Sequence, residues 1–453
     1  GINNTMSMLE KLNALANISS RNEKIGLVQQ YLTDDQLFYR MCRDALDPLY
    51  NYGIQKLPVV KTHSGDMDFA AALLAVEGLR SFHHSNQLIE MVTNVLSLCS
   101  EQDATVIGRV LLKDLRCGVQ IATVNKAIEN NNKKSITKLE PIFDYPCMLT
   151  SAYSEKLLDK LFANNDHMIC QQKCDGMRFN AVIDGSGDVS FFGRSGKEIY
   201  IKDPRFYELF KQFEPGTVVD GELLIDGKED GTALDRKIGN GILNKAVKGT
   251  ITEAESKRIT ATLWDVIPLQ SFRAGFDDEP YQFRLAVLYQ YFEHIETDDR
   301  LFPVYSLEID TVEQANEMFN QMIAEGKEGV IVKSPKAVWK NVRSTEMVKV
   351  KGCEDCDLKV VDYQFGTGRF EGMLGALICE SADGKVQVKV GTGFSEQQRK
   401  QFTSDYIVGK IITVQYNMRI KDKNRPDVDS LFLPRFVEVR EDKDQANTSD
   451  QIV

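Results

Sequence analysis

The sequence lacks any apolar stretch close to the roughly 20 residues that are needed to cross a bilayer. It therefore offers no membrane-spanning segment, and we expect no membrane partner. A basic segment followed by an apolar one is also missing at the start, so nothing indicates secretion. We expect a cytoplasmic protein whose first residue, Gly1, is a remnant of tag removal.

Histidine is scarce, with five residues in 453, and none lies in a recognisable nucleophile context. A histidine-based catalytic triad is therefore not favoured. The nine cysteines are scattered and odd in number, which is typical of reduced thiols in the cytosol. Only Cys353 and Cys356 have the spacing of metal ligands, and no second pair lies nearby to complete four zinc ligands. We interpret them as ordinary thiols.

The chain also lacks the surplus of basic residues that is common in nucleic-acid-binding proteins, because its formal net charge is −11. The charge is uneven, however. Acidic residues are dense in 438–450, whereas basic residues gather in 133–138, 236–258 and 333–351. The total charge therefore neither supports nor excludes DNA as a partner.

The length of 453 residues corresponds to about three domains of ordinary size. Residues 6–134 show spaced apolar positions and few β-branched runs, which predicts an all-helical domain with one helix running from Val106 to a stop at Gly118. A polar stretch, 129–135, followed by Pro141 and Pro146, indicates a linker.

After this linker, short β-rich runs alternate with helical segments, as in a mixed α/β domain. The predicted strands are residues 179–184, 189–193, 217–225, 261–267 and 329–333. Beyond Gly352 the strands become closely spaced, which favours a small β-barrel of the OB type. Its predicted strands are 357–365, 374–380, 385–390 and 411–416, with one helix at 396–404. We therefore predict domains at 1–135, 136–352 and 353–453, the last with an acidic tail.

The sharpest local pattern is Lys173, Asp175, Gly176 and Arg178, which directly precedes a predicted strand. A lysine beside an arginine and other cations has a depressed pKa, so its neutral amine is available as a nucleophile. We therefore expect a lowered pKa at Lys173. The alternative is a surface turn that merely leads into a strand.

Further patterns follow in order along the chain. They are Arg194 after the next strand, Asp220-Gly221-Glu222 within a strand, Trp264-Asp265 within another, Glu328 to Lys333, and the alternating Lys349 and Lys351. Each alone has a structural explanation, such as a turn, a core tryptophan or a solvated strand face. Together they supply a nucleophile, carboxylates for a hard cation, cations for phosphates and an aromatic face, which nucleotidyl transfer requires.

These patterns resemble the motifs KxDGxR, DGE, an aromatic before Asp, EGhhhK and hKhK of the covalent nucleotidyltransferase superfamily, which contains ATP-dependent DNA ligases, RNA ligases and capping enzymes. Arg440 to Lys443 resembles the ligase motif RxDK, and Val390 to Phe394 resembles part of the ligase OB domain. Residues 114–118, 240–245, 248–251, 431–434 and 440–447 resemble the small DNA ligases of T-even bacteriophages. The implied fold is an all-helical DNA-binding domain, a mixed α/β adenylation domain and a C-terminal OB-fold barrel.

The resemblance implies that Lys173 attacks the α-phosphate of ATP and carries AMP, which then passes to the 5′-phosphate of a nick before the 3′-hydroxyl seals the strand. It implies nucleotide contacts from Gln171, Arg178, Arg194, Glu222, Trp264, Lys349, Lys351, Arg440 and Lys443. Trp264 would stack on adenine, and Glu222 and Glu328 would hold Mg²⁺ or the ribose. Arg440 and Lys443 would orient pyrophosphate, which requires the OB domain to swing over the nucleotide.

The implied partner is nicked double-stranded DNA, encircled by a monomer, and a viral source would place the enzyme in the host-cell cytoplasm. The candidate DNA contacts are Lys113, Arg116, Lys126, Lys245 and Lys248, although ordinary solvated cations explain these residues equally well. Three other readings stay open. An RNA ligase or a capping guanylyltransferase shares the lysine motif, and a non-catalytic DNA-end-binding protein would retain only the binding surface.

Overall fold

The computed structural model describes residues 6–82, 85–226, 236–325, 327–350, 354–416, 418–432 and 434–453. The chain divides into two compact units, Gly1–Tyr145 and Pro146–Val453. Within the described ranges, no helix combines the length and the hydrophobicity that a bilayer span requires. The division into three domains with boundaries after residues 135 and 352 stays a prediction.

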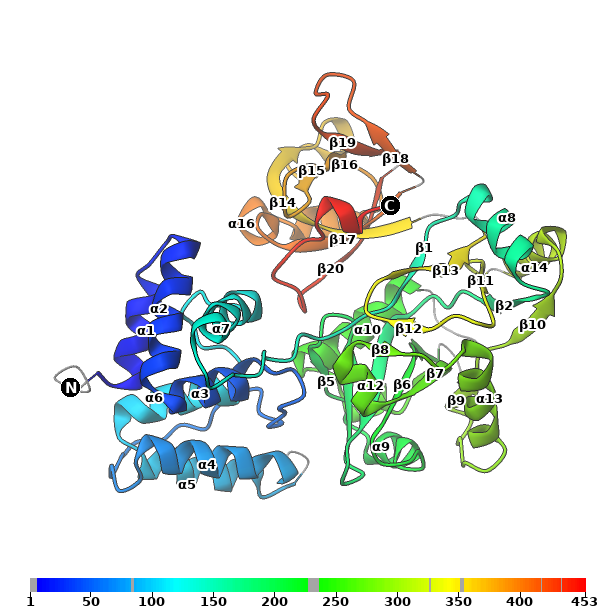
Figure 1. The fold of residues 1–453 in the computed structure, drawn as a ribbon. Coiled ribbons are helices and arrows are strands. Elements are labelled where there is room, and N and C mark those ends of the chain that lie inside the picture. Colours follow the sequence, from blue (N-terminus) through cyan, green and yellow to red (C-terminus); the bar gives the residue numbers. More distant parts are fainter. Residues whose placement is uncertain are drawn as a thin grey trace. The chain divides into compact units, whose positions relative to one another are not determined.

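The first unit is built from α-helices (Figure 1). They are α1 Met8–Ala16, α2 Arg21–Asp34, α3 Gln36–Leu46, α4 Phe69–Leu79, α5 Leu88–Leu98, α6 Glu101–Leu111 and α7 Ile121–Lys134. Several begin with a capping side chain, since Ser20 and Ser100 each accept a hydrogen bond from the third residue of their helix. Leu12, Val28 and Val106 lie in one shared core. The predicted all-helical character is confirmed.

The predicted linker at 129–135 is wrong, because residues up to Lys134 belong to α7. Polar side chains of α7 form hydrogen bonds with the segment that follows the helix. Asn125 exchanges hydrogen bonds with the backbone of Ile142, and Asn132 does the same with Leu139. The chain from 136 onward is thereby tied along the helix, and the compact unit continues to Tyr145.

The helix predicted to reach Gly118 is also shorter, because α6 ends at Leu111. Lys113 and Arg116 have φ angles of 63° and 52°, which no right-handed helix allows. Leu115 is nevertheless 3% exposed, so its apolar side chain packs from a turn. The pattern therefore identified the buried position but not the backbone that carries it.

The second unit contains two sheets that precede the C-terminal region (Figure 1). The six-stranded sheet has the order β5 Glu198–Ile199, β4 Val189–Gly193, β3 Met177–Ile183, β6 Thr217–Ile225, β7 Ile259–Pro268 and β9 Leu301–Pro303. The five-stranded sheet has the order β1 Leu149–Ser151, β13 Arg343–Lys349, β11 Val330–Lys333, β2 Met168–Gln172 and β10 Ser306–Ile309. A short pair joins β8 Phe276–Asp277 to β12 Trp339–Lys340.

Helices cover these sheets and complete two apolar cores. They are α8 Glu155–Asn164, α9 Pro204–Phe210, α10 Arg236–Lys248, α11 Glu253–Ser256, α12 Leu269–Ala274, α13 Tyr281–Phe292 and α14 Val312–Ala324. Phe191 packs against Phe210 of α9 on the six-stranded sheet. Leu158 of α8 and Met318 of α14 belong to the core of the five-stranded sheet. The predicted mixed α/β organisation is confirmed.

The C-terminal part is an antiparallel sheet around its own core. Its order is β16 Gln387–Val390, β15 Leu374–Glu380, β14 Glu354–Phe365, β17 Ile411–Tyr416 and β20 Arg435–Val439, with a hairpin of β18 Met418–Lys421 and β19 Asp429–Phe432. The helices α15 Glu396–Gln401 and α16 Ser404–Ile407 accompany it. The acidic end of the chain is part of this fold, because Ile452 lies in the core.

Candidate active site

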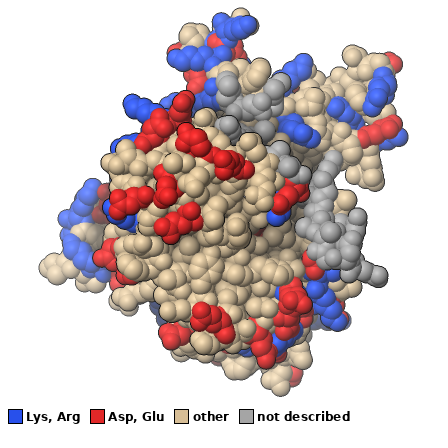
Figure 2. Space-filling view, turned by 90° about the vertical axis from the view of Figure 1, so that its right-hand side faces the viewer, with Lys and Arg blue, Asp and Glu red and all other residues tan. Residues whose placement is uncertain are grey.

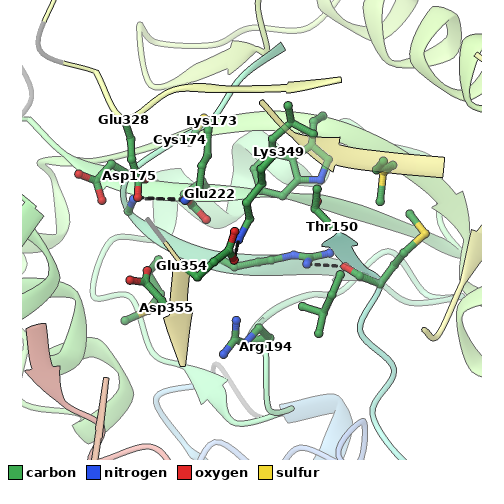
Figure 3. Close-up of a pocket in the computed structure, with 18 of the residues that line it drawn as sticks. Thr150, Lys173, Cys174, Asp175, Arg194, Glu222, Glu328, Lys349, Glu354 and Asp355 are labelled. Carbon is green, nitrogen blue, oxygen red and sulfur yellow. Dashed lines mark hydrogen bonds and ion pairs between the residues drawn. The ribbon is translucent and has the colours of Figure 1, made fainter. Parts of the chain in front are cut away.

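Lys173 directly follows β2 and enters a pocket lined by residues from both sheets and from the C-terminal sheet. Its backbone N–H donates to the carbonyl of Gly329 at 2.9 Å, which fixes the lysine beside the start of β11. The Lys173 ammonium Nζ lies 3.0 Å from Oε1 of Glu328 (Figure 3). Two motifs that are 155 residues apart in the sequence therefore meet at one ion pair.

Two glycines of the predicted motifs allow the backbones around this pocket to approach closely. A Cβ atom at Gly176 would lie 2.1 Å from the carbonyl oxygen of Leu223, and one at Gly221 would lie 2.4 Å from that of Thr262. Real Cβ atoms do not tolerate these distances, so no other residue fits without moving a strand. The glycines thus bring the lysine motif and Glu222 together.

The expectation of a lowered pKa at Lys173 is wrong for this structure. Burial alone would lower the pKa of the ammonium group, but the neighbouring carboxylates of Glu328 and Asp355 outweigh burial and raise it. The motifs indicate cations around Lys173 but not the carboxylates that face it. The carboxylate of Asp355, which lies in a different sheet, could not be assigned to the site from its position in the sequence.

Lys349 is another lysine in the pocket and lies opposite Glu354, whose Oε2 is 2.6 Å from Nζ (Figure 3). Burial and the nearby positive charge of Lys173 lower the pKa of Lys349, against the opposing influence of Glu354. Lys351, the other lysine predicted for this strand, lies outside the described residues, as does Cys353 of the predicted thiol pair. Cys356 is a buried free thiol.

Glu222 and Arg178 face the pocket from neighbouring positions of β6 and β3, which pair in register. Oε2 of Glu222 accepts a hydrogen bond from the backbone of Gly176 at 3.2 Å. Arg178 is held by two bonds to Asp220, at 3.1 and 2.7 Å, and by one to the carbonyl of Met148 at 2.6 Å. Much of its hydrogen-bonding capacity therefore serves the walls of the pocket.

Trp264 also lines the pocket, with the Arg178 guanidinium 5.7 Å and the Lys333 ammonium 5.5 Å from its ring centroid. Lys333 is 4% exposed, and burial lowers its pKa to about 8. Two hydrogen bonds orient the side-chain amide of Gln171. Its Nε2 donates to the Tyr281 hydroxyl at 2.8 Å and to Oγ of Ser306 at 3.0 Å. The amide is thus fixed at the wall that contains the tryptophan.

Arg194, Arg440 and Lys443 converge on one carboxylate, that of Asp357. The distances to Oδ2 are 3.0 Å from Arg194, 3.3 Å from Arg440 and 2.6 Å from Lys443. Burial would raise the pKa of Asp357, but these three cations hold it far below its usual range. Three of the predicted nucleotide ligands therefore form one cluster with an aspartate that the motifs did not include.

Sequence comparison identifies two regions of this chain. Residues 147–351 match the profile of the family described as "ATP dependent DNA ligase domain", and residues 365–440 match "DNA ligase OB-like domain". The chain belongs to the ATP-dependent DNA ligases. It is similar to the DNA ligases of Enterobacteria phages T4 and T6, each 28% identical, over 98% of this chain and 98% of each relative. A solved structure, the ATP-dependent DNA ligase of bacteriophage T7 in complex with ATP, is 21% identical with a TM-score of 0.38 over 65% of this chain and 98% of that one.

The two matches to ligase domains confirm the predicted family and fold class. The OB-like match begins at residue 365, the last residue of β14, and ends at Arg440. The ATP-dependent family implies that the ligase uses ATP. The roles of individual residues stay predictions, although the structure brings most of the predicted nucleotide ligands to one pocket.

The five predicted DNA contacts lie in different surroundings. Nζ of Lys113 donates to the backbone carbonyls of Asp44 and Asp47 at 3.1 and 2.6 Å, so this lysine holds its own unit together. Arg116 is exposed, and Lys126 is half exposed beside Glu129. Lys245 pairs with Glu255 at 2.8 Å, and Lys248 lies 3.7 Å from Glu441. The last four remain accessible to a phosphate.

Within the part of the chain that the structure describes, no group of three or more His, Cys, Asp or Glu side chains is arranged to hold a metal ion. Glu222 and Glu328 nevertheless both line the ligase pocket and offer hard oxygen atoms. Mg²⁺ is commonly held by one or two carboxylates together with the phosphates of a nucleotide. The pair therefore fits Mg²⁺ that arrives with ATP, and it does not fit a cation held by protein alone.

The motifs did not identify several residues that line the pocket. They include Thr150, Arg343, Glu354, Asp355 and Asp357. Arg343 donates to the carbonyls of Thr150 and Gln451, at 2.8 and 2.9 Å, and so joins β1 to the end of the chain. One signal was available, because three carboxylates crowd into residues 354–357 directly after the lysine-rich strand.

Proposed function

We propose that this ligase seals nicks between a 5′-phosphate and a 3′-hydroxyl in duplex DNA through AMP carried on Lys173. The observation that supports this most directly is the ion pair between Lys173 and Glu328 inside a pocket that also contains Glu222, Trp264 and Lys349. A nucleophile, oxygen donors, an aromatic face and phosphate-binding cations are thereby within reach of one nucleotide.

In the first step, Nζ of Lys173 forms a bond to the α-phosphorus of ATP. The bond from that phosphorus to the oxygen of the β-phosphate breaks, and pyrophosphate leaves with the electron pair. The amine must first lose a proton, and Glu328 is positioned to accept it at 3.0 Å. Lys349 would stabilise the negative charge that develops on the α-phosphate.

The walls of the pocket would orient the nucleotide for this attack. Trp264 would stack on adenine, and Gln171, whose amide nitrogen is already occupied, would offer its oxygen to the base. Glu222 and Glu328 would hold Mg²⁺, which when bound neutralises charge on the phosphates. Arg178, Arg194 and Lys351 are further proposed contacts to the ribose or the phosphates.

In the second step, an oxygen of the 5′-phosphate at the nick attacks the phosphorus of the lysine-bound AMP, and the nitrogen–phosphorus bond breaks. In the third step, the 3′-hydroxyl attacks the activated 5′-phosphate, and AMP leaves with the electron pair. Neither step consumes a second nucleotide or forms pyrophosphate.

The proposed partner is a nicked DNA duplex, bound by one copy of the chain. Arg116 and Lys126 of the first unit, and Lys245 and Lys248 of the second, are exposed cations that would contact its phosphates. The phage origin of the two relatives favours the cytoplasm of an infected host cell as the place of action.

One experiment tests this function. The protein is incubated with Mg²⁺ and either ATP or GTP carrying a radioactive α-phosphate, and acid-labile attachment of nucleotide to the protein is measured. We expect AMP attachment that is lost in Lys173→Ala, followed by sealing of a nicked DNA duplex. Attachment of GMP would instead indicate a capping enzyme, better sealing of a nicked RNA duplex would indicate an RNA ligase, and no attachment would indicate a DNA-end-binding protein.

A further inference from the structure

Asp357 lies in β14, lines the pocket and has an exposed fraction of only 1%. Its oxygens contact the three cations described above, and Oδ1 also accepts a hydrogen bond from the Thr413 hydroxyl at 2.7 Å. The carboxylate therefore has four side-chain partners, three of which are predicted ligands of the nucleotide.

The three cations come from separate parts of the second unit. Arg194 follows β4 of the six-stranded sheet, whereas Arg440 and Lys443 follow β20 of the C-terminal sheet. Like charges held this close repel one another unless a carboxylate lies between them. Asp442 pairs with Arg440 through two bonds of 2.8 Å, and the negative charge of Glu438 in the same pocket also acts on Arg440. Arg194 and Lys443 both form their ion pair with Asp357, so two positive charges face one carboxylate there.

We infer that Asp357 is a positioning residue that gathers Arg194, Arg440 and Lys443 into a binding site for the leaving pyrophosphate. This inference rests on the proposed function, because pyrophosphate is formed only when ATP loads Lys173. A pyrophosphate site would affect some of the partial reactions of the ligase and not others. Pyrophosphate takes part in the loading of AMP and in the reversal of that step, whereas the transfer of AMP to DNA and the sealing step do not involve it.

A different role for Asp357 would be that of a stand-in anion, which occupies the phosphate site until ATP displaces it. The surroundings favour a fixed support instead. Asp357 pairs in register with Thr413 of β17, and its backbone N–H donates to Asn447 Oδ1 at 2.7 Å. The backbone of Asn447 in turn donates to the carbonyl of Asp357 at 2.8 Å. These bonds fix the backbone of Asp357, and the Thr413 hydroxyl holds its carboxylate, so the residue is fixed in place beside the three cations.

The test compares Asp357→Asn with wild type in three single-turnover reactions. They are attachment of AMP from ATP, release of ATP from the AMP-loaded enzyme by added pyrophosphate, and sealing of a nick that already carries AMP on its 5′-phosphate. We expect at least a tenfold fall in the first two rates and a change within twofold in the third. The matched control is Asp429→Asn, which breaks a 2.7 Å pair with Arg419 in the same part of the chain, away from the pocket.

Thr413→Val is a milder second variant, because it removes one hydrogen bond to Asp357 and leaves every charge in place. We expect a two- to fivefold fall in the same two reactions, so the test holds even where Asp357→Asn does not fold. An equal fall in all three reactions would reduce Asp357 to a structural role, and faster AMP attachment would show a stand-in anion. Wild type that attaches no AMP would refute the proposed function itself, which is a separate outcome.

Discussion

Lys173 carries a positive charge that two carboxylates stabilise, so the pH dependence of its reaction reports directly on its neighbours. Glu328 and Asp355 raise its pKa, and the reactive free amine therefore forms only at alkaline pH. This differs from a lysine activated by surrounding cations, for which the free amine is already present near neutrality. Loading with ATP consequently depends on an acceptor for the ammonium proton.

We predict that Glu328→Gln shifts the pH profile of AMP attachment toward lower pH, because the lysine loses its main ion-pair partner. The maximal rate is expected to fall by at least tenfold, since the proton acceptor is lost as well. The measurement is the second-order rate constant of AMP attachment between pH 6 and 10. Glu325→Gln is the control, because Glu325 contacts the side chains of Lys327 and Gln321 and does not line the pocket. An unchanged profile in Glu328→Gln would contradict the assignment.

A second prediction concerns Asp44, which is fully buried in the helical unit and bonded to Arg43. Burial, together with a hydrogen bond to Glu77, raises the pKa of Asp44 to about 7. A raised carboxyl pKa favours the folded state at low pH, and this stability is lost as the pH rises toward 7. The pKa of Glu77 moves in the opposite direction, which reduces the net effect.

Asp44→Asn should therefore gain stability relative to wild type between pH 5 and pH 7.5, by on the order of 1 kcal/mol. Denaturant unfolding at the two pH values measures the difference. Asp34→Asn, an exposed substitution at the end of α2, serves as the control. A constant difference between variant and wild type at both pH values would contradict the prediction.

At the scale of single elements, the third prediction concerns Gly221 of the DGE motif, which lies where β6 pairs with β7. We predict that this glycine is needed for the two strands to approach each other. Gly221→Ala would place a methyl group 2.4 Å from the carbonyl oxygen of Thr262, and the strands would have to separate. We expect a loss of about 1–3 kcal/mol in stability and slower AMP attachment, because Glu222 and Trp264 flank this contact. Thermal unfolding and AMP attachment are the measurements.

Gly241→Ala is a matched control on α10, where an added Cβ meets nothing within 4 Å. An alanine there should be neutral or stabilising, because it reduces the freedom of the unfolded chain. Equal losses in the two variants would show that the close approach at Gly221 is not the cause.

The sequence predicted strands better than it predicted the ends of helices. Short runs rich in apolar residues located β4, β6, β15 and β17 to the residue, because such runs are typical of buried strands. The end of α6 was misplaced because Leu115 is buried from a turn rather than from a helix. The polar residues at the end of α7 suggested a linker because their backbone partners, Leu139 and Ile142, cannot be identified from composition.

In the candidate site, motifs predicted which residues share a pocket but not which residues pair with one another. The motifs placed Lys173 and Glu328 in one site, but their ion pair was not predicted. The pairs of Lys349 with Glu354 and of Arg194 with Asp357 depend on how the C-terminal sheet packs, and no local pattern encodes that. Ion pairs between residues far apart in the sequence are therefore the feature of the site that the motifs could not predict.

At the scale of the whole molecule, the residues that line the pocket all belong to the second unit. The core of the helical unit, in turn, contains only residues up to 142. We predict that a chain of residues 146–453 still attaches AMP, within about threefold of the full chain, but binds nicked DNA at least tenfold more weakly. A filter-binding assay and AMP attachment measure the two properties. Loss of AMP attachment in the shortened chain would contradict an independent second unit.

The net charge of −11 is not spread evenly over the surface. Figure 2 shows one face on which acidic side chains surround a broad area without charged residues. A polyanion is repelled from such a face, so duplex DNA is expected elsewhere on the protein. Charge totals consequently say little about the partner of an enzyme of this size.

The strand β14 extends from the nucleotide pocket, where Glu354 contacts Lys349, to Phe365 at the far end of the C-terminal sheet. One continuous strand thus carries both Glu354 and Asp355 into the C-terminal sheet. We expect that a rotation of this sheet would withdraw the two carboxylates from Lys349 and Lys173 together, because both belong to β14. The charge state of the two lysines would then report the position of the C-terminal sheet.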